Sequence, residues 1–117
     1  MSWTEGALVE PLAVSIHGLR IGNFRGGETI AVIGSGTIGL TTVAAARQLG
    51  AGKIIVSARH QQQADMAKTL GADLAGNPEN GEFEDMILQA TEGRGADMTL
   101  ETVGGSLGTT LIQSFEV

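Results

Sequence analysis

The chain contains no cysteine among its 117 residues. It therefore forms no disulfide and no cysteine-based zinc site of its own. Lys and Arg are also scarce: there are 7 of them against 13 Asp and Glu, which gives a net charge of −6. Because a nucleic acid or an anionic membrane attracts clustered Lys and Arg, this balance argues against both partners. A long apolar run and a signal-like N-terminus are lacking too. We therefore expect a soluble, cytoplasmic protein.

The glycine-rich stretch is the most informative part of the sequence. An apolar run at residues 29–33 precedes a G-x-G-x-x-G motif, which leads into a helix-like segment and a second apolar run at residues 54–57. This context predicts a dinucleotide-binding βαβ unit. The first glycine lets the chain turn off the strand, the second lets a pyrophosphate approach the backbone, and the third lets the helix press against the sheet. The candidate pyrophosphate-binding residues at the helix N-terminus are Gly34, Gly36, Thr37, Ile38 and Gly39.

The end of the second strand indicates which nucleotide binds. A domain that selects NAD usually places an Asp or Glu about 20 residues after the glycines, where it accepts hydrogen bonds from the ribose. Here Ser57 and Ala58 are followed by Arg59. A missing carboxylate removes repulsion against a 2′-phosphate, and a guanidinium binds that phosphate through charge-assisted hydrogen bonds. The sequence therefore favours NADP, with NAD as the other candidate. The alternative for Arg59 is a solvated surface charge.

Helical and strand-like segments alternate after this unit. Apolar spacing predicts helices over residues 61–70 and 80–90, a short strand near 73–75, a strand over 97–101 and a last helix with Leu107, Leu111 and Phe115 on one face. In the helix after the glycines, the predicted buried face comprises Ile38, Thr42, Ala45 and Leu49. The alternation predicts an α/β fold, a Rossmann-type doubly wound parallel sheet of about four strands in the order 3-2-1-4.

Ligands of such sheets bind at the carboxyl ends of the strands, between the first and the fourth. The turn that contains Thr102 and Val103 would flank that crevice. Its backbone is a candidate contact for the nicotinamide half of the coenzyme. The alternative is a glycine-rich turn that serves geometry alone.

The first 27 residues differ in pattern from the rest. Residues 1–27 predict an approach helix and a linker, with Pro11 in the first helical turn and Leu12, Ile16 and Leu19 on one face, whereas residues 28–117 form the NAD(P)-binding domain. By pattern alone, Glu10 is a carboxylate at a helix start. We interpret His17 as a packing or surface residue, because no second His or Cys lies at ligand spacing.

Taken together, these segments resemble the coenzyme-binding domain of the medium-chain dehydrogenase/reductase family, which includes the zinc-type alcohol and polyol dehydrogenases. The matching segments are residues 6–14, 32–39, 48–51, 70–73, 95–97 and 101–104. The Glu10-Pro11 pair is similar to the sorbitol and threonine dehydrogenase branch. The resemblance implies an oxidoreductase that binds NAD(P) and interconverts an alcohol or polyol and a carbonyl compound. It also implies that Glu10 lies close to the catalytic zinc of a full-length parent, as a ligand or through a water.

The chain also departs from the family pattern. Family members normally carry an N-terminal catalytic domain with the zinc-binding cysteine and histidine, and further strands after the fourth. On this comparison we expect a domain truncated before the fifth strand, with no zinc bound. Without zinc nothing polarises the carbonyl, so we expect no hydride transfer by this chain alone. The open edge of the fourth strand, at Met98 and Leu100, predicts self-association.

Two other functions fit a chain of this size. One is a stand-alone regulatory NAD(P)-sensing module without catalysis, and the other is a methyltransferase. Both commonly have an acidic residue near the position of Ala58, and the sensor has no reason for the Glu10-Pro11 pair. Ala58 therefore counts against both alternatives.

Overall fold

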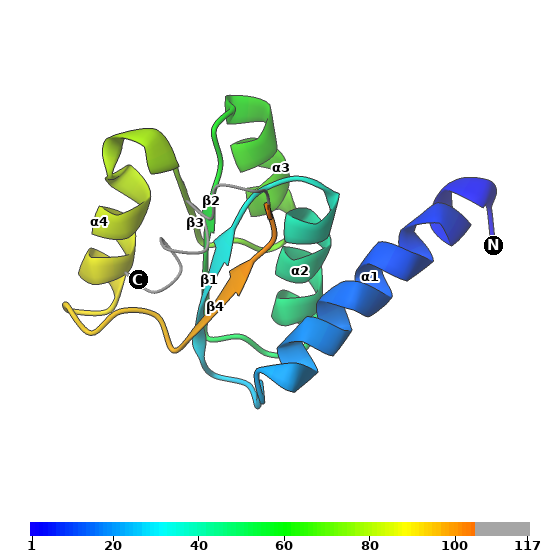
Figure 1. Ribbon diagram of the computed structural model, residues 1–117, viewed down its shortest axis with the longest axis horizontal. Coiled ribbons are helices and arrows are strands. Elements are labelled where there is room, and N and C mark those ends of the chain that lie inside the picture. The colour runs from blue at the N-terminus through cyan, green and yellow to red at the C-terminus, as the bar shows by residue number, and fades with distance from the viewer. Residues whose placement is uncertain (105–117) are drawn as a thin grey trace.

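The computed structural model describes residues 1–104 (Figure 1). The predicted last helix, with Leu107, Leu111 and Phe115, lies outside the described residues. The elements follow one another as α1 (Trp3–Ile21), β1 (Thr29–Ile33), α2 (Thr37–Gln48), β2 (Lys53–Ser57), α3 (Gln61–Leu70), β3 (Leu74–Gly76), the 3₁₀ turn η1 (Pro78–Asn80), α4 (Glu82–Ala90) and β4 (Met98–Glu101).

The strands form a 4-stranded sheet in the order β3-β2-β1-β4. All pairings are parallel, with Ile30 opposite both Ile54 of β2 and Met98 of β4. The predicted fold class and strand order are therefore confirmed. Because the order reverses between β1 and β4, the carboxyl ends of these two strands flank the crevice where ligands of such sheets bind.

Both faces of the sheet are covered by helices. Figure 1 shows α4 on one side of the sheet and α2 and α3 on the other. Ile30, Val32, Ile54 and Val56 belong to the core cluster that includes Val43 of α2. The alternate strand residues Ala31, Ile33 and Ile55 pack with Phe83 and Ile87 of α4. Burial on both faces explains why β1 and β2 are continuous apolar runs rather than alternating ones.

Helix α1 begins earlier than the sequence analysis predicts. Ser2 and Glu5 form a reciprocal capping box: the Ser2 N–H donates to Glu5 Oε2 at 2.7 Å, and the Glu5 N–H donates to Ser2 Oγ at 3.1 Å. Pro11 lies inside the helix, so its predicted position in the first turn was wrong. Because the capping box provides hydrogen-bond acceptors for N–H groups in the turn that begins at Trp3, the helix starts there rather than at Pro11.

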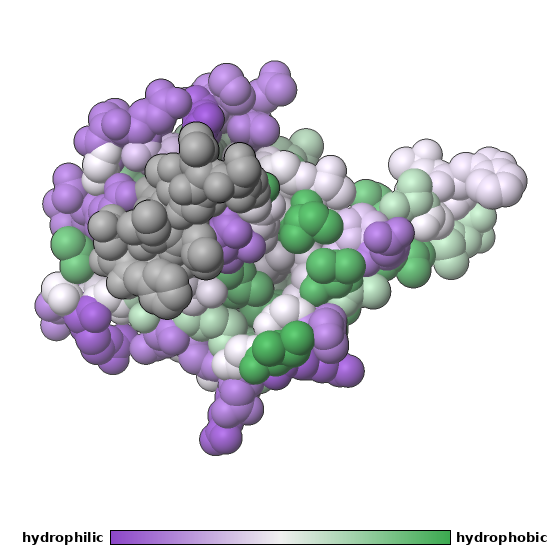
Figure 2. Space-filling view, viewed as in Figure 1, coloured by the Kyte–Doolittle hydropathy of each residue, from purple (hydrophilic) through white to green (hydrophobic). Residues whose placement is uncertain are grey.

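The N-terminal half of α1 extends away from the sheet (Figure 1). Figure 2 shows hydrophobic residues along this helix and where it meets the body of the domain. Leu8, Val9, Leu12 and Val14 are each between 39% and 53% exposed, whereas Ser15 and Leu19 are buried. Of the predicted face, only Leu19 is thus fully buried. None of the helices within residues 1–104 combines the length and the apolar character that crossing a membrane requires.

Three other local predictions need correction. In α2, Thr42 and Ala45 are buried as predicted, but Leu49 caps the helix and is 49% exposed, because Gly39, Val43 and Ala46 supply the rest of the buried face. Strand β3 is shifted by one residue and ends at Gly76. Helix α4 begins after Gly81 rather than Asn80, since Gly81 adopts a left-handed φ of 78° that closes the preceding η1 turn.

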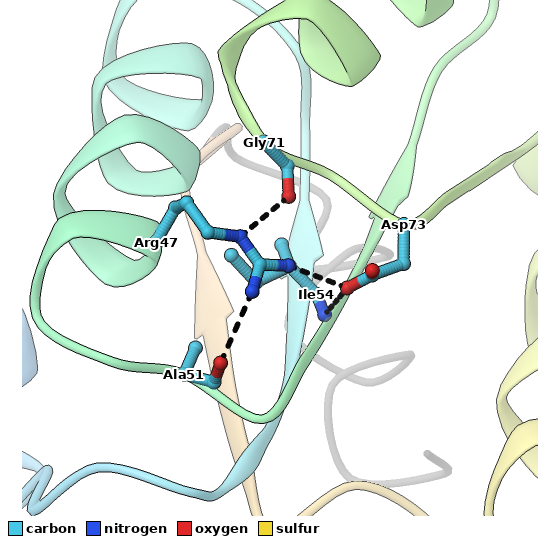
Figure 3. Close-up of polar contacts among 5 residues, drawn as sticks. All are labelled: Arg47, Ala51, Ile54, Gly71 and Asp73. Carbon is cyan, nitrogen blue, oxygen red and sulfur yellow. Dashed lines mark hydrogen bonds and ion pairs between the residues drawn. The ribbon is translucent and has the colours of Figure 1, made fainter.

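Arg47 connects three segments near the amino ends of β2 and β3, at the opposite end of the strands from the glycine loop (Figure 3). Its guanidinium donates to the carbonyls of Gly71 at 3.0 Å and Ala51 at 3.2 Å, and to Asp73 Oδ2 at 2.7 Å. The same Asp73 oxygen accepts the backbone N–H of Ile54 at 2.8 Å. Helix α2, the start of β2 and the turn before β3 are therefore held together by one planar cation, which a lysine cannot imitate.

Replacing Asp73 with alanine removes the acceptor of both Arg47 and the buried Ile54 N–H. We expect the free energy of unfolding to fall by about 1–2 kcal/mol, because a charged hydrogen bond is lost and a buried donor is left unpaired. Urea denaturation measures this change. The control is Arg94→Ala, since Arg94 lies 3.8 Å from Asp97 with 70% of its side chain exposed. That variant should stay within about 0.5 kcal/mol of the wild type. Equal losses in the two variants would contradict the stabilising role of Asp73 as acceptor for Arg47 and Ile54.

Candidate functional site

The glycine loop begins with a sharp turn at the carboxyl end of β1. Gly34 has a φ of +108°, a conformation that L side chains rarely adopt. Its N–H donates to Ser57 Oγ of β2 at 2.8 Å. A Cβ at this position would lie 2.5 Å from Thr102 Oγ1 and 2.8 Å from Val103 Cγ2. Gly34 therefore brings the carboxyl ends of β1, β2 and β4 into contact.

Gly39 allows α2 to approach this loop closely. It is buried, and a Cβ on it would overlap the carbonyl group of Gly34 and lie 3.1 Å from Thr102 Oγ1. Any side chain at position 39 would push the first turn of α2 away from the end of β1. The packing within the chain is thus sufficient to explain glycine at both ends of the motif.

Gly36 is different from the other two glycines. Its φ of −79° suits any residue, and apart from its chain neighbours no atom of the described residues lies within 4 Å of the position that a Cβ would take. It is the N-cap of α2, provides no side-chain cap, and is followed by no acidic residue in the first turn. Among the described residues, Gly36 and Thr37 are exposed, so the orphan N–H groups and the positive end of the α2 dipole fit a phosphate.

Ser35 is fixed by a contact that the sequence analysis missed. Its side chain is buried, and its Oγ lies 3.0 Å from Gln63 Oε1, to which it donates a hydrogen bond. Gln63 stands on α3, so this bond joins the glycine loop to the helix that follows β2. A glutamine in a polar stretch of a helix carries no signal of such a contact.

The residues at the end of β2 fall into an inner and an outer group. Ser57 and Ala58 are 4% and 7% exposed, and the Ser57 hydroxyl accepts the Gly34 N–H beneath the loop. The side chain of Arg59 is 63% exposed, and its Nε lies 3.8 Å from Glu79 Oε1 of η1. Of the three residues predicted to contact the adenosine end of a coenzyme, Arg59 is the one that reaches solvent.

The turn after β4 lies against the same loop. The N–H and the hydroxyl of Thr102 both donate to the Ile33 carbonyl, at 2.9 and 2.7 Å. Glu101 Oε1 accepts the N–H groups of Val103 and Gly104, each at 2.8 Å. These donors are therefore occupied within the chain. Val103 is 55% exposed after the carboxyl end of β4.

Glu10 is the residue that the resemblance places close to the zinc of a full-length parent. Glu10 lies in the exposed N-terminal half of α1. Within residues 1–104, no group of three or more His, Asp or Glu side chains is arranged to hold a metal ion. The described residues thus do not fit a zinc ion by themselves, and we derive no chemical step through one. His17 is exposed on α1, in keeping with a surface residue.

Known proteins share this arrangement. A relative from Bacillus subtilis named sorbitol dehydrogenase is 38% identical over 104 residues, which are 89% of this chain and 30% of that protein. A relative from Entamoeba histolytica named NADP-dependent isopropanol dehydrogenase is 36% identical over 102 residues, 87% of this chain and 28% of its own length. Among solved structures, an oxidoreductase/dehydrogenase of unknown specificity from Escherichia coli matches with a TM-score of 0.90 and 35% identity, covering 100% of this chain and 33% of that one.

The chain thus spans about 30% of the length of these relatives. The family profile described as zinc-binding dehydrogenase matches residues 37–117, which is more than half of the chain. This match begins at the first turn of α2, the part of the fold that carries the open helix N-terminus. The chain belongs to the zinc-binding dehydrogenase family.

Proposed function

We propose that this chain is the coenzyme-binding domain of a zinc-type alcohol or polyol dehydrogenase, and that it binds NADP(H) in preference to NAD(H). The observation that carries the proposal is the N-terminus of α2 at Gly36, which has no side-chain cap. Packing within the described residues does not require a glycine at this position, and it leaves the space beside Gly36 open. A pyrophosphate accounts for both, because it needs the backbone N–H groups and the room.

The end of β2 supports NADP. Ala58 presents no carboxylate there, and the exposed Arg59 stands where a 2′-phosphate of the adenosine ribose would lie. The guanidinium would contribute charge-assisted hydrogen bonds to that phosphate. Ser57 would act from below, by holding the Gly34 N–H and thus the shape of the loop. The name of the Entamoeba histolytica relative includes NADP dependence, in agreement with this choice.

The nicotinamide half would then lie toward the end of β4, beside Thr102 and Val103. Thr102 holds this turn to Ile33, and Glu101 holds the backbone of Val103 and Gly104. When bound, the nicotinamide ring takes up or delivers a hydride in the reversible conversion of an alcohol to a carbonyl compound. The residues of this chain would bind and orient the coenzyme. The family membership favours this role over a stand-alone regulatory sensor.

Two further proposals concern neighbouring protein. We propose that Glu10 and the exposed apolar side chains of α1 face a catalytic domain that supplies the zinc ligands, since such a surface is typical of an interface. We also propose self-association along β4, which pairs with β1 on one side in the described sheet.

Substitutions at Gly36 and Gly39 test coenzyme binding and stability separately. Gly39→Ala should lower the free energy of unfolding by about 2 kcal/mol or more, because its Cβ would overlap the Gly34 backbone. Gly36→Ala should stay within about 1 kcal/mol of the wild type but weaken NADPH binding about tenfold or more, since its methyl group occupies the pyrophosphate position. Urea denaturation and calorimetric titration measure the two effects. Unchanged NADPH affinity in Gly36→Ala would contradict the proposed site.

The coenzyme preference is tested by titrating the chain with NADPH and with NADH. We expect NADPH to bind more tightly, and Arg59→Ala to weaken NADPH about tenfold while NADH changes less than about twofold, because only NADPH carries the 2′-phosphate. Arg94→Ala is the matched control, since it removes a similarly exposed arginine from the turn after α4: its side chain is 70% exposed, against 63% for Arg59. Tighter binding of NADH by the wild type would refute the preference for NADP.

A further inference from the structure

The exposed arginine at the end of β2 has an acidic neighbour that the coenzyme proposal does not use. Glu79 Oε1 lies 3.8 Å from Arg59 Nε, and the two side chains are 67% and 63% exposed. The sheet register explains this proximity: Ser57 pairs with Gly76, so the residues that follow β2 and β3 leave the same edge side by side. Glu79 thus stands at the carboxyl edge, where the adenosine end of a coenzyme would bind.

The position of Glu79 does not depend on its carboxylate. Asn77 Oδ1 accepts the Glu79 backbone N–H at 2.9 Å, and Pro78 fixes the preceding backbone of η1. The ion pair itself is long and largely solvated, so it contributes little to stability. Replacing the carboxylate with an amide is therefore expected to leave the turn intact.

The carboxylate does matter to an anion that approaches Arg59. A 2′-phosphate at the guanidinium must displace Glu79 from its ion pair and then lie within a few ångströms of a second negative charge. NAD(H) has an uncharged hydroxyl at the same position, so it neither displaces Glu79 nor is repelled by it. Glu79 would therefore weaken the binding of NADP(H) and leave that of NAD(H) nearly unaffected.

We propose that Glu79 is a specificity-determining residue that limits the preference for NADP(H) by competing with the 2′-phosphate for Arg59. This inference rests on the proposed coenzyme function and adds a residue to it. Since the sites are exposed, the effect is electrostatic and screened by salt, with a Debye length of about 10 Å at 0.1 M and about 3 Å at 1 M. The chain thus pairs an attractive and a repulsive charge at one position, and their balance sets the selectivity.

The test is calorimetric titration of wild type and Glu79→Gln with NADPH and NADH, and with adenosine 2′,5′-bisphosphate and AMP as probes of the adenosine end alone. We expect Glu79→Gln to tighten NADPH and the bisphosphate about three- to tenfold, with NADH and AMP changed less than about twofold. The gain should shrink toward onefold at about 1 M salt. The matched control is Asp85→Asn on α4, which changes the net charge equally but carries no ion pair with Arg59.

Three results would overturn the inference: an unchanged NADPH to NADH ratio in Glu79→Gln, an equal gain in Asp85→Asn, or a gain that persists in full at high salt. Arg59→Ala keeps this failure separate from that of the proposed function. If Arg59→Ala weakens NADPH but Glu79→Gln has no effect, the role of Glu79 alone is refuted. If Arg59→Ala has no effect, the proposed contact between Arg59 and the 2′-phosphate fails and the inference fails with it. If the wild type binds neither coenzyme, the proposed coenzyme-binding function fails as well.

Discussion

The close contact between the first turn of α2 and the loop that leaves β1 determines the geometry of the candidate site. Gly39 lies directly against the Gly34 carbonyl, where no side chain fits. This contact holds the N-terminus of α2 at the carboxyl edge of the sheet, beside Ser57 of β2 and Thr102 after β4. A helix displaced from this edge would direct its free N–H groups elsewhere, and the dipole and the strand ends would no longer meet at one surface.

The polar groups at this edge divide into those that build the site and those left for a ligand. The hydroxyls of Ser57, Thr102 and Ser35 all bond within the chain, to the loop, to β1 and to α3 respectively. These hydroxyls hold the loop in place, and their hydrogen-bonding capacity is used largely within the chain. The N-terminus of α2 and the guanidinium of Arg59 remain outward, and both attract negative charge. In a chain with a net charge of −6, such a local cationic site requires this kind of specific placement.

Sequence patterns predicted the sheet well because two features act locally: apolar runs that suit strands buried on both faces, and glycines that mark the turn and the close packing. The start of α1 was predicted poorly because Pro is favoured in the first turn of a helix, whereas here the Ser2–Glu5 capping box starts the helix before Pro11. Contacts such as Ser35 with Gln63, and Arg59 with Glu79, depend on which strands are neighbours and in what register. A single sequence carries no signal for them, since each residue alone looks like an ordinary surface side chain. Ser57 was predicted as a phosphate contact, but its hydroxyl accepts the Gly34 N–H and is buried. This contact also depends on the pairing of neighbouring strands, which the sequence alone does not show.

In the function that we propose, a dinucleotide binds across the carboxyl ends of the strands with its pyrophosphate at the N-terminus of α2. The most direct measurement is a two-dimensional NMR titration of the ¹⁵N-labelled chain with NADPH, which follows each backbone amide separately. We expect the largest shifts at the amides of residues 36–39, further shifts near Arg59 and Val103, and small shifts at the distant Arg47–Asp73 contact. Saturable shifts centred elsewhere, or none at residues 36–39 at millimolar NADPH, would contradict the proposed position of the pyrophosphate.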